Sequence, residues 1–463
     1  MSNILKLHEA YKKKEIKPSE YTKKLMEEIK ASNLNAFITL NENALLEAKK
    51  LDDEEVDNIF FGVPIAIKDN ILTKGLRTTS ASKMLEDFMP VYDATVISKI
   101  KAKKMIIIGK TNMDEFAFGS RSDTSAFGKV LNPCDLDRVP GGSSGGSAAA
   151  TKAFNLLSLG SDTGGSIRQP ASFCGVVGMK PTYGLVSRYG LTSFASSLDQ
   201  IGPLTNNVLD NALLLDLIKG RDENDLTSSS RKIDLLSDID KDIKGLKIAL
   251  PKFYFEGLSE DVKERFDDLI KFLEKEGVSF NYVDTPYFDK SYTLYQILAM
   301  GEASSNLARF DSIRYGSHVD CDNLDDLYEI NRGKFFGEEV KRRIMVGSYL
   351  LSGDNAKIYY DKALSIRKAI CKTFDNIYKD YDLILAPITS SHAPKFDEEY
   401  NYAFDDLMAI PSNLAGTPSL SLNTFTLNGL PLNIQIEGPK FSEALIYRLA
   451  HYIEKNYKEK KDV

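Results

Sequence analysis

Two short segments in the middle of the chain carry the residues best suited to covalent chemistry. The first is residues 141–147, which read GGSSGGS, and the second is residues 160–168, which read GSDTGGSIR. Glycine at this density allows positive φ angles and a close approach of backbone to a ligand. The serine hydroxyls become nucleophiles when a neighbouring base removes their protons. The pattern therefore indicates functional loops.

A phosphate-binding P-loop is one alternative for a glycine-rich segment. Its pattern is G-x-x-x-x-G-K-[ST], and Gly109, Lys110 and Thr111 follow an apolar run and supply its last part. Lys104 stands where the leading glycine is required, and neither glycine–serine segment ends in Gly-Lys. The sequence therefore gives little support to ATP binding through a P-loop.

A Ser-His-Asp hydrolase is a second alternative, because residues 142–146 match the pattern G-x-S-x-G. That motif needs a strand directly before it, whereas residues 137–140, read DRVP, are typical of a loop. The downstream histidines are His318, His392 and His451, and none lies in a glycine-rich segment. We interpret them as ordinary surface or structural residues, although sequence distance alone leaves a role for one of them open.

A serine activated by lysine is the third alternative. The lysine must be shielded from water, because burial lowers its pKa and leaves the amine neutral. Lys68 fits this requirement, since it ends the apolar run GVPIAI of residues 62–67, whereas most other lysines lie in polar helical stretches. A lysine at the end of a strand can also simply reach solvent, so its position alone leaves both interpretations open.

Alternating strand-like and helix-like segments must position these loops. Residues 246–250 and 278–283 predict strands. Between them, Ser259 can cap a helix with one apolar stripe, and Gly277 suits its end. Such a βαβ unit implies parallel strands flanked by helices, and with no internal repeat or long linker we expect one large α/β domain. Further strands are expected at 105–108 and 383–385, and further helices at 211–219, 338–351, 357–373 and 442–457.

Composition limits the classes of function. The 463 residues carry 59 basic and 66 acidic side chains, a net charge of −7, which argues against a chain that grips nucleic acid alone. The N-terminus lacks the apolar run of a secretory signal, and no run is long enough to span a bilayer, so we expect a soluble cytoplasmic protein. The cysteines are scattered, which predicts free thiols and no metal site; they are Cys134, Cys174, Cys321 and Cys371.

Taken together, these motifs resemble the amidase signature family. The match includes the Lys68 segment and residues 141–147 and 160–175. It implies an α/β fold with a large mixed central sheet covered by helices on both faces. It also implies a single amidase domain over residues 1–463, with core motifs at 62–203 and a substrate-side helical region at about 285–380. Within the family, four segments are similar to the glutamine-hydrolysing subunits of tRNA-dependent amidotransferases: 112–116 (NMDEF), 196–203 (SSLDQIGP), 302–306 (EASSN) and 413–416 (NLAG).

The resemblance assigns roles to three residues. Ser166 would be the nucleophile, Ser143 a bridging serine that follows a cis peptide bond, and Lys68 the base. Protons would pass from Ser166 to Ser143 and from Ser143 to Lys68. The activated Ser166 oxygen would then attack a carboxamide carbon and form an acyl-enzyme.

The same resemblance places an oxyanion site in the second segment. The backbone N–H groups of Thr163, Gly164 and Gly165, with that of Ser166, would face the developing oxyanion, and small residues allow such a turn. One departure from the family is visible, because the spacing from Ser143 to Ser166 is one residue shorter. The gap falls within residues 151–157, before the second segment, so we expect the site to be unmoved.

The resemblance further implies that free glutamine is the substrate. Arg343 would bind the α-carboxylate through two parallel hydrogen bonds, Asp406 would bind the α-amine, and Tyr295 would line the pocket. The alternative for Arg343 is a solvated charge in a basic helical turn. The alternative for Asp406 is a first-turn acid near a helix start.

The reaction of such amidotransferases has two halves. This chain would release ammonia and need no cofactor of its own. A partner, called the B subunit, would bind misacylated Glu-tRNA(Gln), or in some organisms Asp-tRNA(Asn), and activate its carboxylate with ATP and Mg²⁺. A small C subunit would wrap the pair into a heterotrimer. The alternative is a free-standing amidase for small carboxamides, whereas a non-catalytic scaffold is disfavoured because Lys68, Ser143 and Ser166 are all intact.

Overall fold

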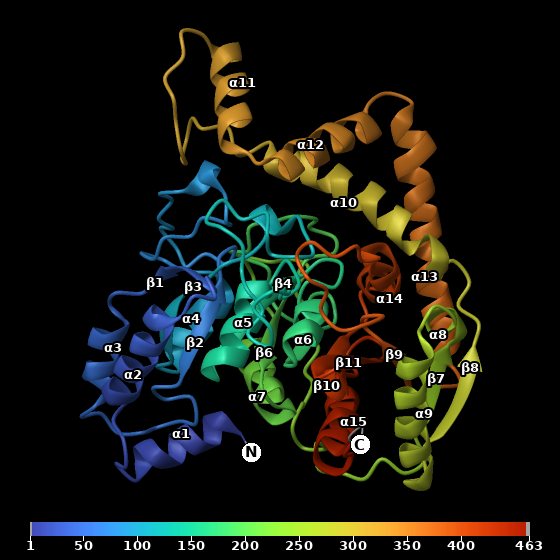
Figure 1. Cartoon of the computed structure of the whole chain (residues 1–463). Helices are drawn as coiled ribbons and strands as arrows, with labels where there is room; N and C mark the ends of the chain where they lie inside the picture. Colours follow the sequence, from blue (N-terminus) through green and yellow to red (C-terminus); the bar gives the residue numbers. More distant parts are fainter. Residues whose placement is uncertain (1, 460–463) are drawn as a thin grey trace.

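The computed structural model describes residues 2–459 and is built around one eleven-stranded sheet (Figure 1). The strand order is β1-β3-β2-β4-β6-β5-β10-β11-β9-β7-β8. β2 runs parallel to β3 and β4, and β7 runs parallel to β8 and β9, whereas the remaining neighbours are antiparallel. The predicted mixed sheet is therefore confirmed. The strands are Phe37–Leu40 (β1), Pro64–Lys68 (β2), Ile106–Thr111 (β3), Leu157–Asp162 (β4), Val177–Lys180 (β5), Gln200–Thr205 (β6), Lys247–Pro251 (β7), Ser279–Val283 (β8), Leu383–Pro387 (β9), Ser419–Leu427 (β10) and Leu430–Glu437 (β11).

Helices cover both faces of this sheet. They are Asn3–Lys12 (α1), Pro18–Ala31 (α2), Ala44–Leu51 (α3), Thr95–Ala102 (α4), Gly145–Phe154 (α5), Arg168–Cys174 (α6), Val208–Ile218 (α7), Lys252–Glu256 (α8), Glu260–Lys275 (α9), Ser291–Leu307 (α10), Leu324–Phe335 (α11), Glu338–Leu351 (α12), Lys362–Ile377 (α13), Tyr402–Ala415 (α14) and Glu443–Asn456 (α15). No helix within residues 2–459 is long and apolar enough to cross a bilayer.

The predicted βαβ unit is confirmed as β7, α9 and β8, with β7 and β8 parallel. Ser259 occupies the N-cap position of α9, but its side chain accepts no hydrogen bond from the described first turn. Glu260 and Asp261 stand in that turn instead, where negative charge favours the positive end of the helix dipole. The helix predicted at 357–373 is confirmed, although its first part, Ala356–Asp361, is a π-helix and α13 follows from Lys362 to Ile377.

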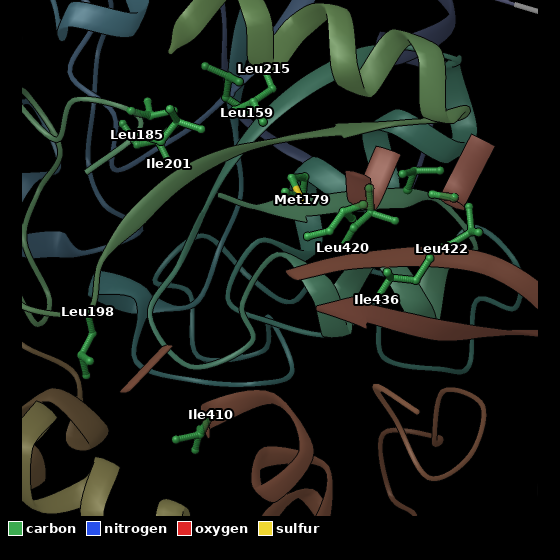
Figure 2. Close-up of a cluster of buried hydrophobic side chains, with 14 of the residues drawn as sticks. Leu159, Met179, Leu185, Leu198, Ile201, Leu215, Ile410, Leu420, Leu422 and Ile436 are labelled. Atoms are coloured by element: carbon green, nitrogen blue, oxygen red, sulfur yellow. The ribbon is translucent and has the colours of Figure 1, made fainter. Parts of the chain in front are cut away.

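The alternation of side chains along β4 shows how the two faces differ. The Ser158 hydroxyl accepts a hydrogen bond from Thr151 of α5 at 2.9 Å, so this side chain points to the α5 face. Its neighbour Leu159 points to the other face and belongs to the main buried cluster with Leu215 of α7. Figure 2 shows Leu159 next to Leu215, with Met179 of β5 further along the same buried cluster.

A layer of helices formed by α10, α12, α13 and α14 lies at one side of the sheet, and α11 projects beyond it (Figure 1). α10 packs against α12, α13 and α14. The region expected to be helical at about 285–380 holds α10 to α13. The two glycine–serine segments lie between the strand ends and this layer, since residues from both sides line one pocket.

Candidate active site

Lys68 ends β2, an inner strand between β3 and β4, and every residue of this strand is buried. Its side chain is fully buried and turns inward rather than to solvent. The Nζ atom lies 2.8 Å from the Oγ of Ser143, 2.8 Å from the Oγ of Ser144 and 2.9 Å from the Oγ of Ser161. The strand therefore delivers one amine into a cluster of three serine hydroxyls.

The surroundings of Lys68 favour a neutral amine. Burial lowers the pKa of Lys68 from 10.5 to about 7, because water no longer solvates the charged form. The carboxylates of Asp114, Asp162 and Asp199 oppose this effect from a distance. A large fraction of Lys68 is therefore unprotonated near neutral pH, as a proton acceptor must be.

The first glycine–serine segment forms the loop that presents Ser143 and then begins α5. The peptide bond between Gly142 and Ser143 is cis, and both Ser143 and Ser144 are fully buried. Gly142 has no room for a side chain, since a Cβ there would lie 2.1 Å from Oδ2 of Asp114. Its N–H donates to Oε1 of Gln169 at 3.0 Å. Residues 133–144 contain no strand, so the nucleophile-elbow arrangement is not met here.

The second segment turns from β4 into α6 and carries Ser166. The carboxylate of Asp162 accepts the N–H of Gly165 at 2.8 Å and the N–H of Ile167 at 3.1 Å, so it holds the backbone on both sides of Ser166. Burial alone would raise the pKa of Asp162, but the Arg168 guanidinium at 3.1 Å holds it well below its usual range. The turn is thus fixed by a buried, ionised carboxylate.

The turn leaves a set of backbone donors for an oxyanion. The Gly165 N–H is engaged by Asp162, whereas the N–H groups of Thr163, Gly164 and Ser166 have no hydrogen-bond acceptor within residues 2–459. The Thr163 hydroxyl donates to Oδ1 of Asp199 at 2.7 Å, which fixes the start of the turn. The oxyanion proposal therefore rests on Thr163, Gly164 and Ser166, with Gly165 serving the turn itself.

Ser166 opens onto a small polar pocket that also contains all three residues predicted to bind substrate. Tyr295 comes from α10, Arg343 from α12 and Asp406 from α14. Tyr295 lies against the turn that carries Ser166, because a Cβ on Gly164 would lie 2.8 Å from the Tyr295 Cζ. The lining is Ala117, Gly119, Ser120, Gly142, Gly164, Gly165, Ser166, Gln169, Tyr295, Gln296, Arg343 and Asp406.

The guanidinium of Arg343 is held at the pocket wall rather than extended into solvent. It lies over the rings of Phe118 and Phe194, at 5.1 and 5.6 Å from their centroids, and its Nε donates to Glu339 at 2.6 Å. The two terminal nitrogens donate to no group in the described part of the chain. They form the edge of the fork that suits a carboxylate.

Asp406, and not Asp405, faces the pocket. Burial, together with the neighbouring Asp405, raises the pKa of Asp406 from 3.8 to about 8, against the opposing effect of Arg343. The carboxyl of Asp405 is turned away and is bonded by the Tyr400 hydroxyl at 2.6 Å and the Ser390 N–H at 2.8 Å. A cation bound in the pocket would restore the charged form of Asp406.

The structure also settles the alternatives considered for the sequence motifs. Gly109, Lys110 and Thr111 all lie within β3, and the Lys110 amine donates to Thr78 Oγ1 at 2.8 Å, so they do not form a phosphate-binding loop. No histidine is found among the described pocket residues. His392, for example, contacts Arg138 and the carbonyl of Ala393.

Several residues of the site carried no prediction. Ser144, Ser161 and Asp162 lie inside the two glycine–serine segments, so their place in the sequence was the available signal. Lys180 is buried like Lys68, and burial lowers its pKa to about 7. It donates to the carbonyl of Thr417 and contacts no serine hydroxyl within the described residues. Lys68 differs from Lys180 in the serine hydroxyls that its amine contacts, and these contacts cannot be read from the sequence.

The chain belongs to the amidase family, because a family model described as Amidase matches residues 20–447. The A subunit of glutamyl-tRNA(Gln) amidotransferase from Listeria innocua is 50% identical over 474 residues, which cover 99% of this chain and 98% of that protein. The crystal structure of the corresponding A subunit from Thermotoga maritima matches with a TM-score of 0.81 and 43% identity, covering 95% and 92% of the two chains. The peptide amidase of Stenotrophomonas maltophilia matches with a TM-score of 0.85 but 26% identity, covering 98% and 96%.

Proposed function

We propose that this chain is the glutamine-hydrolysing subunit of a glutamyl-tRNA(Gln) amidotransferase. The observation that carries this proposal is the pocket, where Ser166 shares one small space with a single guanidinium, Arg343, and a single carboxyl, Asp406. A free amino acid presents one carboxylate and one ammonium group, and these two side chains complement both. The identity of 50% to the Listeria innocua protein of this name, over nearly the full chain, supports it.

The chemistry begins with the buried lysine. Neutral Lys68 takes the proton of Ser143, Ser143 takes the proton of Ser166, and the Ser166 oxygen attacks the carboxamide carbon of glutamine. The N–H groups of Thr163, Gly164 and Ser166 stabilise the oxyanion, and donors of this kind lower the barrier by about 3–4 kcal/mol each. The proton returns through the same serine to the leaving nitrogen, which departs as ammonia.

A water molecule completes the cycle. It attacks the glutamyl ester of Ser166 while Lys68, again neutral after giving its proton to ammonia, accepts a proton through Ser143. Glutamate leaves, and Ser166 regains its proton. Each turnover thus consumes one glutamine and one water, and it yields one glutamate and one ammonia.

The ammonia would be used by a partner protein. We infer that the B subunit of the complex binds misacylated Glu-tRNA(Gln), or Asp-tRNA(Asn), and activates its carboxylate with ATP and Mg²⁺, and that a small C subunit joins the complex. The net charge of −7 on this chain is consistent with leaving tRNA contact largely to the partner. The cytoplasm, where tRNA is charged, is the compartment that this role requires.

The test is ammonia release by the chain purified together with its co-expressed partners. Glutamine should be hydrolysed faster than propionamide or a peptide amide, and Ser166→Ala should abolish the activity while leaving the melting temperature near that of the wild type. Ser158→Ala is the matched control, since it removes a buried hydroxyl that bonds to Thr151 and does not line the pocket, and it should remain active. Faster hydrolysis of propionamide or a peptide amide would favour a free-standing amidase, and full activity of Ser166→Ala would refute the mechanism.

A further inference from the structure

The Lys68 amine is surrounded by neutral oxygen atoms. Its four contacts are the hydroxyls of Ser143, Ser144 and Ser161 and, at 3.3 Å, the carbonyl of Ser161. No carboxylate lies within ion-pair distance of Nζ in the described chain, whereas buried Lys110 has Asp69 at 3.9 Å. Ser143 belongs to the proposed proton relay, but the relay gives Ser144 and Ser161 no task.

We propose that Ser144 and Ser161 are positioning residues, whose hydroxyl oxygens hold the Lys68 ammonium group and aim it at Ser143. The proposal rests on the proposed role of Lys68 as the base. Ser144 follows Ser143 directly and stands at the start of α5, whereas Ser161 comes from β4. The two residues therefore fix Lys68 from two different elements.

The hydrogen bonds of Ser144 and Ser161 leave each hydroxyl an oxygen lone pair for the Lys68 amine. The Ser144 hydroxyl donates to the Ser161 carbonyl at 3.1 Å, and its oxygen accepts the Ser161 N–H at 3.3 Å, which leaves a second lone pair for an N–H of Lys68. The Ser161 hydroxyl oxygen accepts the Asn70 side-chain amide at 2.9 Å and has a second lone pair for Lys68. When Ser143 gives up its proton, the new ammonium group has three N–H donors, and the three hydroxyl oxygens accept them.

The charged groups around Lys68 are engaged elsewhere. Asp114, after β3, accepts the Ser122 N–H, Asp162, at the end of β4, is paired with Arg168, and Asp199, before β6, accepts the Thr163 hydroxyl. They act on Lys68 only over a distance. Hydrogen bonds to the ammonium form favour that form, so the nearby hydroxyls keep the pKa of Lys68 from falling further.

Removing one of the two hydroxyls should therefore weaken the base and change its pH dependence. The acid limb of the pH–rate profile is the range in which the rate rises with pH as Lys68 loses its proton. In Ser161→Ala and Ser144→Ala, this limb should move to lower pH by about one to two units, because a charge-assisted hydrogen bond to the ammonium form is lost. The plateau rate should fall about tenfold or more, because a weaker base accepts the proton less readily. KM for glutamine should be nearly unchanged, since neither residue lines the pocket.

Two readouts keep this inference separate from the proposed function. The first is the rate at which a fluorophosphonate modifies Ser166: a Ser166 O–P bond forms, fluoride leaves, and the proton passes through Ser143 to Lys68. The second is glutamine hydrolysis by the assembled complex. If the fluorophosphonate reacts but glutamine is not hydrolysed, the proposed substrate is wrong and the positioning role is still tested by the first readout.

The controls are matched to the site. Ser158→Ala removes another buried hydroxyl of β4 without touching Lys68 and should leave the acid limb in place. Ser161→Thr keeps a hydroxyl and should restore both the limb and most of the rate. If Ser161→Ala and Ser144→Ala lower the rate but their acid limbs lie at the same pH as that of Ser158→Ala, the two residues have only a structural role. That result would refute the inference. Unchanged rates would refute it equally.

Discussion

Replacing Lys68 by methionine should remove a cost of folding that depends on pH. Burial lowers the pKa of this lysine from 10.5 to about 7, so between these values the unfolded chain binds more protons than the folded chain. Stability therefore rises with pH across this window, and the Lys68 cost is full below about pH 7. Relative to its value at high pH, proton linkage lowers the free energy of unfolding by about 4 kcal/mol at pH 7 and by about 2 kcal/mol at pH 9. Lys68 alone should thus add about 2 kcal/mol of stability between pH 7 and pH 9.

The expected change in melting temperature follows from the size of the chain. An unfolding entropy of about 2.1 cal/mol/K per residue gives about 1 kcal/mol/K for a chain of this length. A gain of about 2 kcal/mol is therefore a rise of about 2 °C in the wild type that Lys68→Met lacks. Differential scanning calorimetry of both proteins at pH 7 and pH 9, at one scan rate, measures the change in melting temperature between the two pH values. The prediction concerns how this change differs between the wild type and Lys68→Met.

The comparison isolates Lys68 from the other buried lysines. Burial also lowers the pKa of Lys110 to about 8 and of Lys180 to about 7, but both contributions are present in each protein and cancel. Lys152→Met changes an exposed lysine on α5 and should follow the wild type. If the wild type and Lys68→Met shift equally between the two pH values, Lys68 is charged in the folded protein and cannot be the neutral base.

The substrate pocket yields two further expectations. In steady-state kinetics, Arg343→Lys should raise KM for glutamine by about 10- to 100-fold with a smaller change in kcat, because a point charge replaces a guanidinium that can form two parallel hydrogen bonds. An unchanged KM would show that Arg343 does not bind the carboxylate. KM for glutamine should also fall as pH rises toward about 8, because the ionised form of Asp406 binds the ammonium group of glutamine. This pH dependence of KM should vanish in Asp406→Asn. If it persists in the variant, another group causes it.

The sequence was a good guide where a short pattern determines the local structure. The apolar run before Lys68 predicts a buried strand, and β2 is buried at every position, because side chains of an inner strand meet helices or strands on all sides. The strand–helix–strand pattern from residue 246 to 283 was equally decisive. The alternation of apolar and polar residues is set by the chain itself and needs no distant partner.

The sequence was a poor guide where distant segments meet. Lys110 and Lys180 are as buried as Lys68, yet only Lys68 reaches the serine hydroxyls of the two glycine–serine segments, and this depends on how β2, α5 and β4 are arranged. The pairing of Asp162 with Asn413 joins residues 251 positions apart, which no local pattern encodes. The π-helix at Ala356–Asp361 was not predicted for a different reason, because the sequence pattern indicates a helix there but does not separate π-turns from α-turns.

One helix couples the substrate side of the pocket to the nucleophile. α14 carries Asp406, which faces the pocket, and Asn413, which lies two turns further along and donates to the carboxylate of Asp162 at 2.9 Å. Arg168 adds a second connection, since it donates to the carbonyl of Ala409 on α14 at 3.0 Å while it pairs with Asp162. Asp162 in turn holds the backbone on both sides of Ser166. The side of the pocket that holds Asp406 and the turn that carries Ser166 are therefore joined through buried, charge-assisted hydrogen bonds, which are stronger in this low-dielectric interior than they would be in water.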